Sequence, residues 1–285
     1  MEEKCWCGSG LDYEVCHKSM DEKLAILKKK GAQIPTRAMI KNKEQIKGIR
    51  EAGRINSLVL DEVEKRIRIG MSTQDIDDVV YNTTLKYKGI PAPLNYEGFP
   101  KSVCTSVNDQ VCHGIPSEKD ILRDGDIINV DCTTIYDGYF GDASRMFALG
   151  FVGDKARRLI QTTKEAVKIA EEHLKPYSRL GDIGYYINRH AKANGFSVVR
   201  EIGGHGVGLQ MHEDPYVCHV GELNTGLVLV PGMIFTIEPM INEGTRKVFC
   251  DSANGWTIYT ADRKLSAQVE NMVLITEDGF EILSE

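Results

Sequence analysis

The stretch NVDCTTIYDGYFGDASR, residues 129–145, is decisive for the fold because it describes a β-hairpin with two acidic residues in an apolar setting. Its halves are rich in β-branched and aromatic residues and meet at Asp137-Gly138, a dipeptide typical of a two-residue hairpin turn. With that turn, Asp131 lies opposite Ser144. Asp142, two residues before Ser144, shares the face of Asp131 because side chains alternate along a strand. The two carboxylates are therefore predicted to converge.

Converging carboxylates require a positive charge, because otherwise they repel each other and one keeps its proton. No lysine or arginine of the hairpin is placed to supply it, since Arg145 points to the opposite face in this register. A metal cation would serve. Later strand-like segments offer further candidate ligands: His205 in a glycine-rich segment, and Glu238 and Glu270 in apolar runs where a core strand normally carries Val or Ile.

The charge of this set predicts two metal ions. Four carboxylates and the imidazole of His205 carry a formal charge of −4, which two divalent ions would balance. Two metals about 3.5–4 Å apart are the arrangement that activates water for hydrolysis of amides or phosphates. The alternatives are a buried hydrogen-bonded polar cluster or a single Ca²⁺ site, although the imidazole and the lack of a loop-type ligand spacing argue against calcium.

Length and composition limit the classes of protein. The 285 residues, 42% of them hydrophobic and 27% charged, suffice for one large domain or one domain with a small appendage. The net charge of −6 argues against a general nucleic-acid binder, so no specific DNA partner is expected. No apolar run approaches the roughly 20 residues of a membrane span, and the first ten residues lack an apolar signal-peptide core. We therefore expect a cytoplasmic protein without a membrane segment, and nothing demands more than a monomer.

The first residues form a compact cluster of metal-binding side chains. CWCGSGLDYEVCH, residues 5–17, has Cys-x-Cys and Cys-His pairs that could hold a structural Zn²⁺ through Cys5, Cys7, Cys16 and His17. The alternative is a disordered tail with stray thiols. The pattern resembles the SEC-C type zinc heads on the tail of the preprotein-translocase motor ATPase, where they act as docking modules.

The predicted organisation has three parts: a SEC-C type zinc-binding motif at 1–17, a linker at 18–40 and a catalytic domain at 41–285. The segment 18–40 is expected to contain some helix before the linker around Gly31 and Pro35. It carries the lysine run 28–30, which is either a solvated surface or a contact for ribosomal RNA. From residue 41 on, two pairs of predicted helices alternate with strand-rich segments. The helices are expected at 44–67, 72–89, 154–174 and 180–195, the second beginning with a Ser72–Asp75 capping pair. This order predicts an α+β fold of two similar halves, with helices covering a curved antiparallel sheet.

Five motifs in order give the chain a specific resemblance. They are CHGIP (112–116), the hairpin, GGHGVGLQMHEDP (203–215), FTIEPM (235–240) and AQVENMVLI (267–275). From about residue 40 to the end, the chain is similar to the type I methionine aminopeptidases of the pita-bread (creatinase/aminopeptidase) fold. The resemblance implies a metallo-exopeptidase that removes the initiator methionine from nascent proteins and peptides, preferentially before a small second residue.

The resemblance also implies the metal ligands. One ion would be held by Asp131, Asp142 and Glu270, and the other by Asp142, His205, Glu238 and Glu270. The metals would be Co²⁺, Mn²⁺, Fe²⁺ or Zn²⁺, and they would lower the pKa of a water that attacks the first peptide bond.

Roles for the remaining site residues follow from the same resemblance. Glu238 would shuttle the proton to the leaving amine, His212 would donate to the scissile carbonyl oxygen, and His113 would contact the scissile amide nitrogen. The methionine pocket would be lined by Tyr96, Phe99, Cys104, Met211 and Trp256. Relatives often carry phenylalanine in place of Met211, and ordinary core packing is the alternative for all five.

His173, His190 and His219 are read as structural. Proline-specific enzymes of the fold usually carry a large N-terminal domain that this chain lacks. Metal-free relatives of the fold act as protein-binding modules and have lost metal ligands, whereas this chain keeps all five.

Overall fold

The hairpin forms two long paired strands in the computed structural model, which describes residues 3–285. They are β4 (Ile127–Tyr136) and β5 (Tyr139–Ala148). Asp131 lies opposite Ser144, as predicted, and Tyr136 opposite Tyr139. The turn residues Asp137 and Gly138 have φ angles of 49° and 80°, the left-handed conformation that a type I′ hairpin turn requires.

The hairpin belongs to the first of two main sheets. In it β4 also pairs with β2 (Cys104–Val107) and β1 (Ile90–Pro91). The second sheet has five strands in the order β15 (Phe280–Ser284), β14 (Asn271–Ile275), β9 (Ile234–Ile237), β7 (Gly204–Gly206) and β8 (Glu213–Val217). The backbones of Ser144 and Glu270 exchange two hydrogen bonds of 3.2 Å, which join the hairpin to the residue that precedes β14.

Two small three-stranded sheets complete the strand layer. One has the order β13 (Ser266–Gln268), β10 (Met240–Asn242) and β6 (Ser197–Val198). The other has the order β11 (Val248–Cys250), β12 (Ile258–Thr260) and β3 (Gln110–Cys112). All pairings between named strands are antiparallel, as the sequence predicted.

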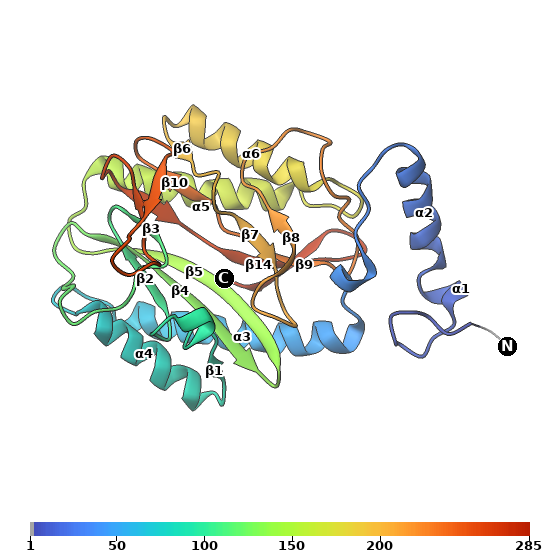
Figure 1. Cartoon of the computed structure of the whole chain (residues 1–285), viewed down its shortest axis with the longest axis horizontal. Coiled ribbons are helices and arrows are strands. Elements are labelled where there is room, and N and C mark those ends of the chain that lie inside the picture. The colour runs from blue at the N-terminus through green and yellow to red at the C-terminus, as the bar shows by residue number, and fades with distance from the viewer. Residues whose placement is uncertain (1–2) are drawn as a thin grey trace.

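Two helix pairs flank these strands. The first is α3 (Lys43–Arg66) with α4 (Thr73–Lys86), and the second is α5 (Asp154–Glu172) with α6 (Leu180–Ala193). Figure 1 shows the pairs on opposite sides of the strands, in agreement with the predicted two halves. The predicted capping box of Ser72 and Asp75 is present at the start of α4. The predicted helices are confirmed, with ends that differ by a few residues.

Close backbone contact holds α3 against the hairpin. At Gly141 of β5, an added Cβ would collide with the backbone of Ala52 and Gly53 in α3. The buried face of α3 includes Ile55 and Val59, and burying each such side chain contributes about 1.5–3 kcal/mol. The helix therefore fixes the hairpin that carries the two aspartates.

The N-terminal residues pack on the second half of the molecule. Helix α1 (Tyr13–Cys16) is followed by α2 (Lys18–Lys29), and Figure 1 shows both at one end of the molecule. Met20 and Leu24 of α2 are buried in the same apolar cluster as residues of α5 and α6. Two short helical turns, η1 (Arg37–Met39) and η2 (Tyr96–Gly98), lie outside the main elements. The segment predicted as a linker thus contains a helix that contributes to the core.

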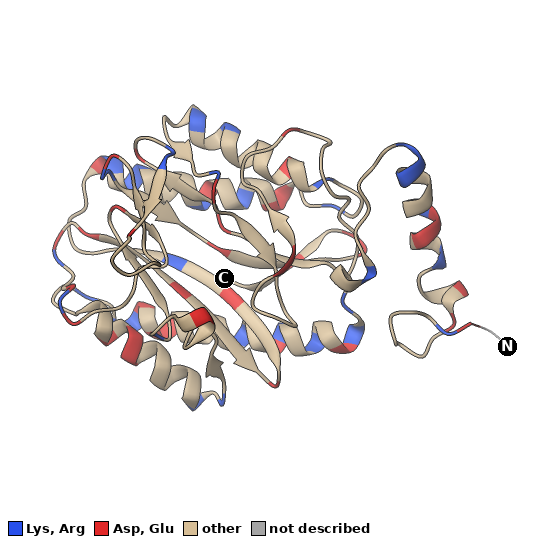
Figure 2. Ribbon diagram, in the orientation of Figure 1, with Lys and Arg blue, Asp and Glu red and all other residues tan. Residues whose placement is uncertain are grey.

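Charged residues mark the surface of the helices. Figure 2 shows most lysines, arginines and acids on helices and loops, with acidic positions also on β4 and β5. Within residues 3–285, no helix has the length and the apolar character that crossing a bilayer requires.

Candidate active site

The first half of the site comes from the hairpin. Asp131 on β4 and Asp142 on β5 lie on the same face, and Thr133 donates a hydrogen bond of 2.8 Å to Asp142 Oδ1. Cys104 of β2 lies opposite Asp131. The hydrogen bond from Thr133 holds the side chain of Asp142 in a defined orientation.

The second half of the site comes from the five-stranded sheet. His205 lies on β7, Glu238 directly follows β9, and Glu270 directly precedes β14. His205 Nε2 is 3.8 Å from Asp142 Oδ2 and 3.5 Å from Glu238 Oε1. Ligand atoms of Asp142, His205 and Glu270 all lie within 4.8 Å of one another. Residues 128 positions apart in the chain, Asp142 and Glu270, therefore meet at one point.

Three neighbours that the sequence did not single out hold Glu238. Thr236 donates to its Oε1 at 2.8 Å, and Gln268 donates to its Oε2 at 3.2 Å. The backbone N–H of Glu238 donates to Nε2 of the buried His219 at 3.1 Å. Thr236 and Gln268 each lie two residues from a candidate ligand, and that spacing on a strand was the available signal. His219 was read as structural, and it is a buried partner of the site's backbone.

A cavity of about 450 Å³ opens at these residues. Its lining includes all five candidate metal ligands and all seven predicted catalytic and substrate-binding positions outside that set. Those seven are Tyr96, Phe99, Cys104, His113, Met211, His212 and Trp256. The lining also includes residues that the sequence did not predict, namely Pro93, Glu97, Thr133, Ile202, Gly203, Gly204 and Tyr216.

Aromatic rings define the walls of this cavity. Trp256 meets Phe99 edge-on with ring centroids 5.2 Å apart, and His113 at 6.3 Å. Tyr96 Oη lies 2.8 Å from His212 Nδ1, and the ring of His212 is 4.4 Å from that of His205. The two histidines and the tyrosine thus form one contiguous group beside the acidic cluster.

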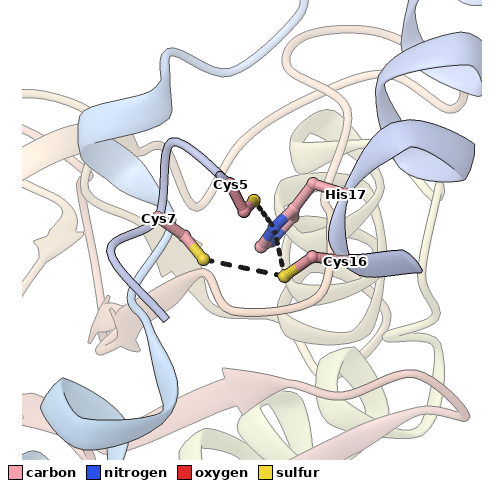
Figure 3. Close-up of side chains that lie close together, drawn as sticks. All are labelled: Cys5, Cys7, Cys16 and His17. Carbon is pink, nitrogen blue, oxygen red and sulfur yellow. Dashed lines mark hydrogen bonds between the residues drawn. The ribbon is translucent and has the colours of Figure 1, made fainter. Parts of the chain in front are cut away.

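A second candidate metal centre lies in the N-terminal head, residues 3–17. Figure 3 shows Cys5, Cys7, Cys16 and His17 pointing toward one another, and their ligand atoms all lie within 4.8 Å of each other. Cys7 Sγ and Cys16 Sγ are 3.7 Å apart. Sulfurs about 2.3 Å from a shared tetrahedral Zn²⁺ would be separated by roughly that distance. Burial raises the pKa of Cys5 to about 11, so the thiol needs a cation to become a thiolate ligand.

Comparison with known proteins places the chain in a family. The model of metallopeptidase family M24 matches residues 47–277, and that of the SEC-C motif matches residues 3–19. A methionine aminopeptidase of Rickettsia prowazekii is 45% identical over 236 residues, which cover 83% of this chain and 91% of that protein. Methionine aminopeptidase A of Synechocystis is 46% identical over 244 residues, 85% and 96% of the two chains. The chain belongs to the methionine aminopeptidases of family M24. It is therefore a metallo-aminopeptidase that removes N-terminal methionine, and its substrates are the N-termini of polypeptides.

The fold agrees with this family. A crystal structure of the methionine aminopeptidase from Rickettsia prowazekii superposes with a TM-score of 0.84 at 43% identity, covering 86% of this chain and 99% of that one. The pita-bread fold predicted from the sequence is confirmed. A methionine aminopeptidase takes divalent metals, and the carboxylate–imidazole cluster and the cysteine–histidine head are the candidate metal centres.

The electrostatics of the acidic cluster fit a metal site of this family. Burial and the neighbouring Asp142 hold the pKa of Asp131 well above its usual range. Burial raises the pKa of Asp142 to about 7, and it also raises the pKa values of Glu238 and Glu270. Within residues 3–285, no lysine or arginine forms an ion pair with any of these carboxylates. Such a donor set becomes fully ionised only when cations bind among it.

The histidines of the cavity are held neutral. Burial, together with the neighbouring imidazoles, lowers the pKa of His113 and that of His212 to about 4. A neutral imidazole can donate one hydrogen bond and accept another. Both rings are therefore suited to substrate contacts at neutral pH.

Proposed function

We propose that Asp131, Asp142, His205, Glu238 and Glu270 hold two divalent ions at which the enzyme hydrolyses the first peptide bond after methionine. The observation that supports this most is the meeting of three buried carboxylates, those of Asp142, Glu238 and Glu270, at the imidazole of His205, in a cavity that Asp131 also lines. No cationic side chain of residues 3–285 is paired to these carboxylates. The exposed fractions of Asp142, Glu238 and Glu270 are 3%, 6% and 2%, so water cannot balance their charge. Bound ions would lower the pKa of a water molecule and polarise the carbonyl group of the scissile peptide bond.

Glu238 is the proposed proton shuttle. Thr236 and Gln268 hold its two carboxylate oxygens, which fixes the direction in which it accepts a proton from water. The same carboxyl group then passes that proton to the leaving amine.

His212 is the proposed hydrogen-bond donor to the scissile carbonyl oxygen. When the hydroxyl of Tyr96 donates to Nδ1 of His212, the proton of the neutral ring lies on Nε2. That N–H then meets the negative charge that develops on the oxygen. His113, which also lines the cavity and lies near Trp256, is the proposed contact of the amide nitrogen.

Methionine is proposed to occupy the pocket formed by Tyr96, Phe99, Cys104, Met211 and Trp256. Sulfur interacts favourably with aromatic rings, which three of these residues provide. The α-amino group would lie at the metal held by Asp131, so only a free N-terminus fits. We also propose that the enzyme prefers substrates whose second residue is small.

The N-terminal head is proposed as a docking element that brings the enzyme to nascent chains at the ribosome. In this proposal the head comprises residues 1–17, the linker residues 18–40 and the catalytic domain residues 41–285. Cytoplasm is the proposed location, because nascent chains are made there and its reducing conditions keep cysteines available for zinc. The proposed working form is a monomer.

Metal stoichiometry measured together with turnover tests the catalytic proposal. Metal-free protein titrated with Mn²⁺ in a calorimeter should bind two ions at the catalytic site, and the loaded enzyme should cleave Met-Ala-Ser but not its N-acetylated form or a Xaa-Pro peptide. Glu270→Gln should lose a metal and most of its activity. Glu171→Gln is the matched control, because Glu171 is buried at 5% exposure and bonds to Asn271 outside the site. Equal metal content and activity in both variants would contradict the ligand assignment.

A further inference from the structure

A buried ion pair lies next in sequence to the lining of the substrate cavity, because Glu213 directly follows His212. Lys41, which directly precedes the N-cap of α3, places its Nζ on Glu213 Oε2. The side chains of Lys41 and Glu213 are 1% and 13% exposed. Lys41 is the one buried lysine or arginine among residues 3–285. Burying such a charge is costly, and the pair is retained only where its geometry is well satisfied.

The carboxylate of Glu213 organises the turn between β7 and β8, residues 207–212. Its Oε1 accepts hydrogen bonds from the backbone N–H groups of Leu209 at 2.6 Å and Gln210 at 2.9 Å. Hydrogen bonds from two successive amides to one charged oxygen fix the direction of the backbone between them. The next two residues of the turn, Met211 and His212, line the substrate cavity.

Lys41 is itself anchored to the body of the enzyme. Its backbone N–H donates to the carbonyl of Gly232 at 2.9 Å, and the preceding Ile40 forms a β-bridge with Met233. Met233 directly precedes β9, and Glu238 directly follows the same strand. The ion pair therefore ties the cavity turn to the strand that carries the proposed proton shuttle.

We propose that the Lys41–Glu213 ion pair is a positioning device for the cavity turn, setting where Met211 meets the substrate side chain and where His212 meets the scissile carbonyl. The inference rests on the proposed roles of these two residues. Neither Lys41 nor Glu213 lines the substrate cavity, so both act through the turn. A displacement of about 1 Å at a reacting group can lower the rate by roughly 10²-fold, which makes such a support important.

Hydrogen exchange gives a readout that does not depend on activity. In the metal-loaded full-length enzyme, the amides of Leu209 and Gln210 should exchange faster in Lys41→Met than in the wild type. Lys41→Arg, which keeps the charge, should retain most of the protection. Lys155→Met is the matched control, because it breaks an ion pair with Glu243 at the surface. Unchanged exchange of the turn in Lys41→Met would overturn the proposal.

Kinetics separates positioning from a general loss of stability. Lys41→Met leaves a buried carboxylate unpaired and can fail to fold, so Glu213→Gln and the double variant Lys41→Met/Glu213→Gln are measured beside it. The double variant contains no unpaired charge and should melt near the wild type. Because the turn is less firmly held, its kcat/KM for Met-Ala-Ser should remain about tenfold to a hundredfold low, with unchanged metal content. Its preference for methionine over norleucine should also fall.

The outcomes distinguish this inference from the proposed function. If the double variant is folded and has wild-type kcat/KM and selectivity, the ion pair is only structural and the inference is wrong. If the wild-type enzyme itself fails to cleave methionyl peptides, the proposed function is wrong instead. In that case, hydrogen exchange still decides whether the pair orders the turn.

Discussion

At the scale of single residues, the chemistry of the cavity depends on which nitrogen of His212 carries the proton. When the hydroxyl of Tyr96 donates to Nδ1 of His212 across their 2.8 Å contact, the proton of the neutral ring lies on Nε2. Burial keeps the ring neutral, since the pKa of His212 is lowered to about 4. Two substitutions test the ring and its orienting partner separately.

His212→Ala should lower kcat of the loaded enzyme by about 10²- to 10³-fold, because a donor aimed at a developing oxyanion contributes about that much. Tyr96→Phe keeps the donor and loses only one hydrogen bond, so it should cost about tenfold or less. Both are measured as kcat on Met-Ala-Ser, with metal content as a control. If Tyr96→Phe lowered kcat as much as His212→Ala, the hydroxyl of Tyr96 would have its own role in the reaction.

At this scale the sequence alone was enough to predict that the candidate ligands of the hairpin share a face. Asp131 and Asp142 follow from the turn at Asp137-Gly138, because the hairpin register determines which residues share a face. The supports Thr236 and Gln268 were not predicted, because a Thr or Gln in a strand is unremarkable until its partner is known. His219 was likewise undetectable, since its contact is with a backbone N–H 19 residues away.

At the scale of elements, long periodic segments were predictable and short strands were not. The predicted helix at 44–67 corresponds to α3 (Lys43–Arg66), because a repeated apolar face of many turns leaves little ambiguity. Strands of two or three residues, such as β6 and β10, carry no usable period. The pairing of these strands depends on contacts distant in sequence. The burial of α2 also depends on such contacts, because its buried Met20 and Leu24 belong to a largely polar segment.

Gly141→Ala tests the contact of α3 with the hairpin. An added methyl group would collide with the backbone of Ala52 and Gly53, which cannot move as a flexible side chain does. We expect a loss of about 1–3 kcal/mol or more in the free energy of unfolding, measured by urea denaturation. Gly279→Ala is the control, because nothing lies within 4 Å of its added Cβ. Equal stability of the two variants would show that α3 can shift away from β5 at little cost.

At the scale of the whole molecule, the acidic cluster couples metal binding to folding. Buried carboxylates opposed by one another cost free energy in the metal-free protein, and bound cations remove that cost. The two halves of the enzyme each supply part of the ligand set. Metal binding should therefore stabilise the assembly of both halves rather than one of them.

This coupling predicts a specific dependence on pH. The pKa of Asp142 rises from 3.8 to about 7 on folding without metal, so the native state binds more protons than the unfolded chain between these values. The metal-free protein should therefore lose stability as the pH rises from about 4 through about 7. Thermal unfolding at pH 5.5 and pH 8 should show a larger increase in Tm on adding Mn²⁺ at pH 8. If the increase in Tm on adding Mn²⁺ were no larger at pH 8 than at pH 5.5, this predicted pH dependence would be wrong.

The head and the catalytic body make separable contributions to the whole enzyme. Cys7 accepts a hydrogen bond from Asn42 through its carbonyl oxygen, and Trp6 lies against Arg37, whose guanidinium is 4.9 Å from the ring centre. Trp6 also packs against the main apolar cluster of the body, but none of these contacts involves an acidic ligand. The buried Met20 and Leu24 remain when residues 1–17 are removed.

Removal of residues 1–17 should therefore leave kcat on Met-Ala-Ser unchanged and abolish co-sedimentation with ribosomes. Cys5→Ser/Cys16→Ser should give the same result and reduce the zinc content by one ion, because two of four ligands are lost. Cys250→Ser is the matched control, since that exposed thiol lies outside both candidate centres. If the truncated enzyme still co-sedimented with ribosomes, docking would belong to another surface. A loss of peptide turnover on truncation would instead show that the head supports the active site itself.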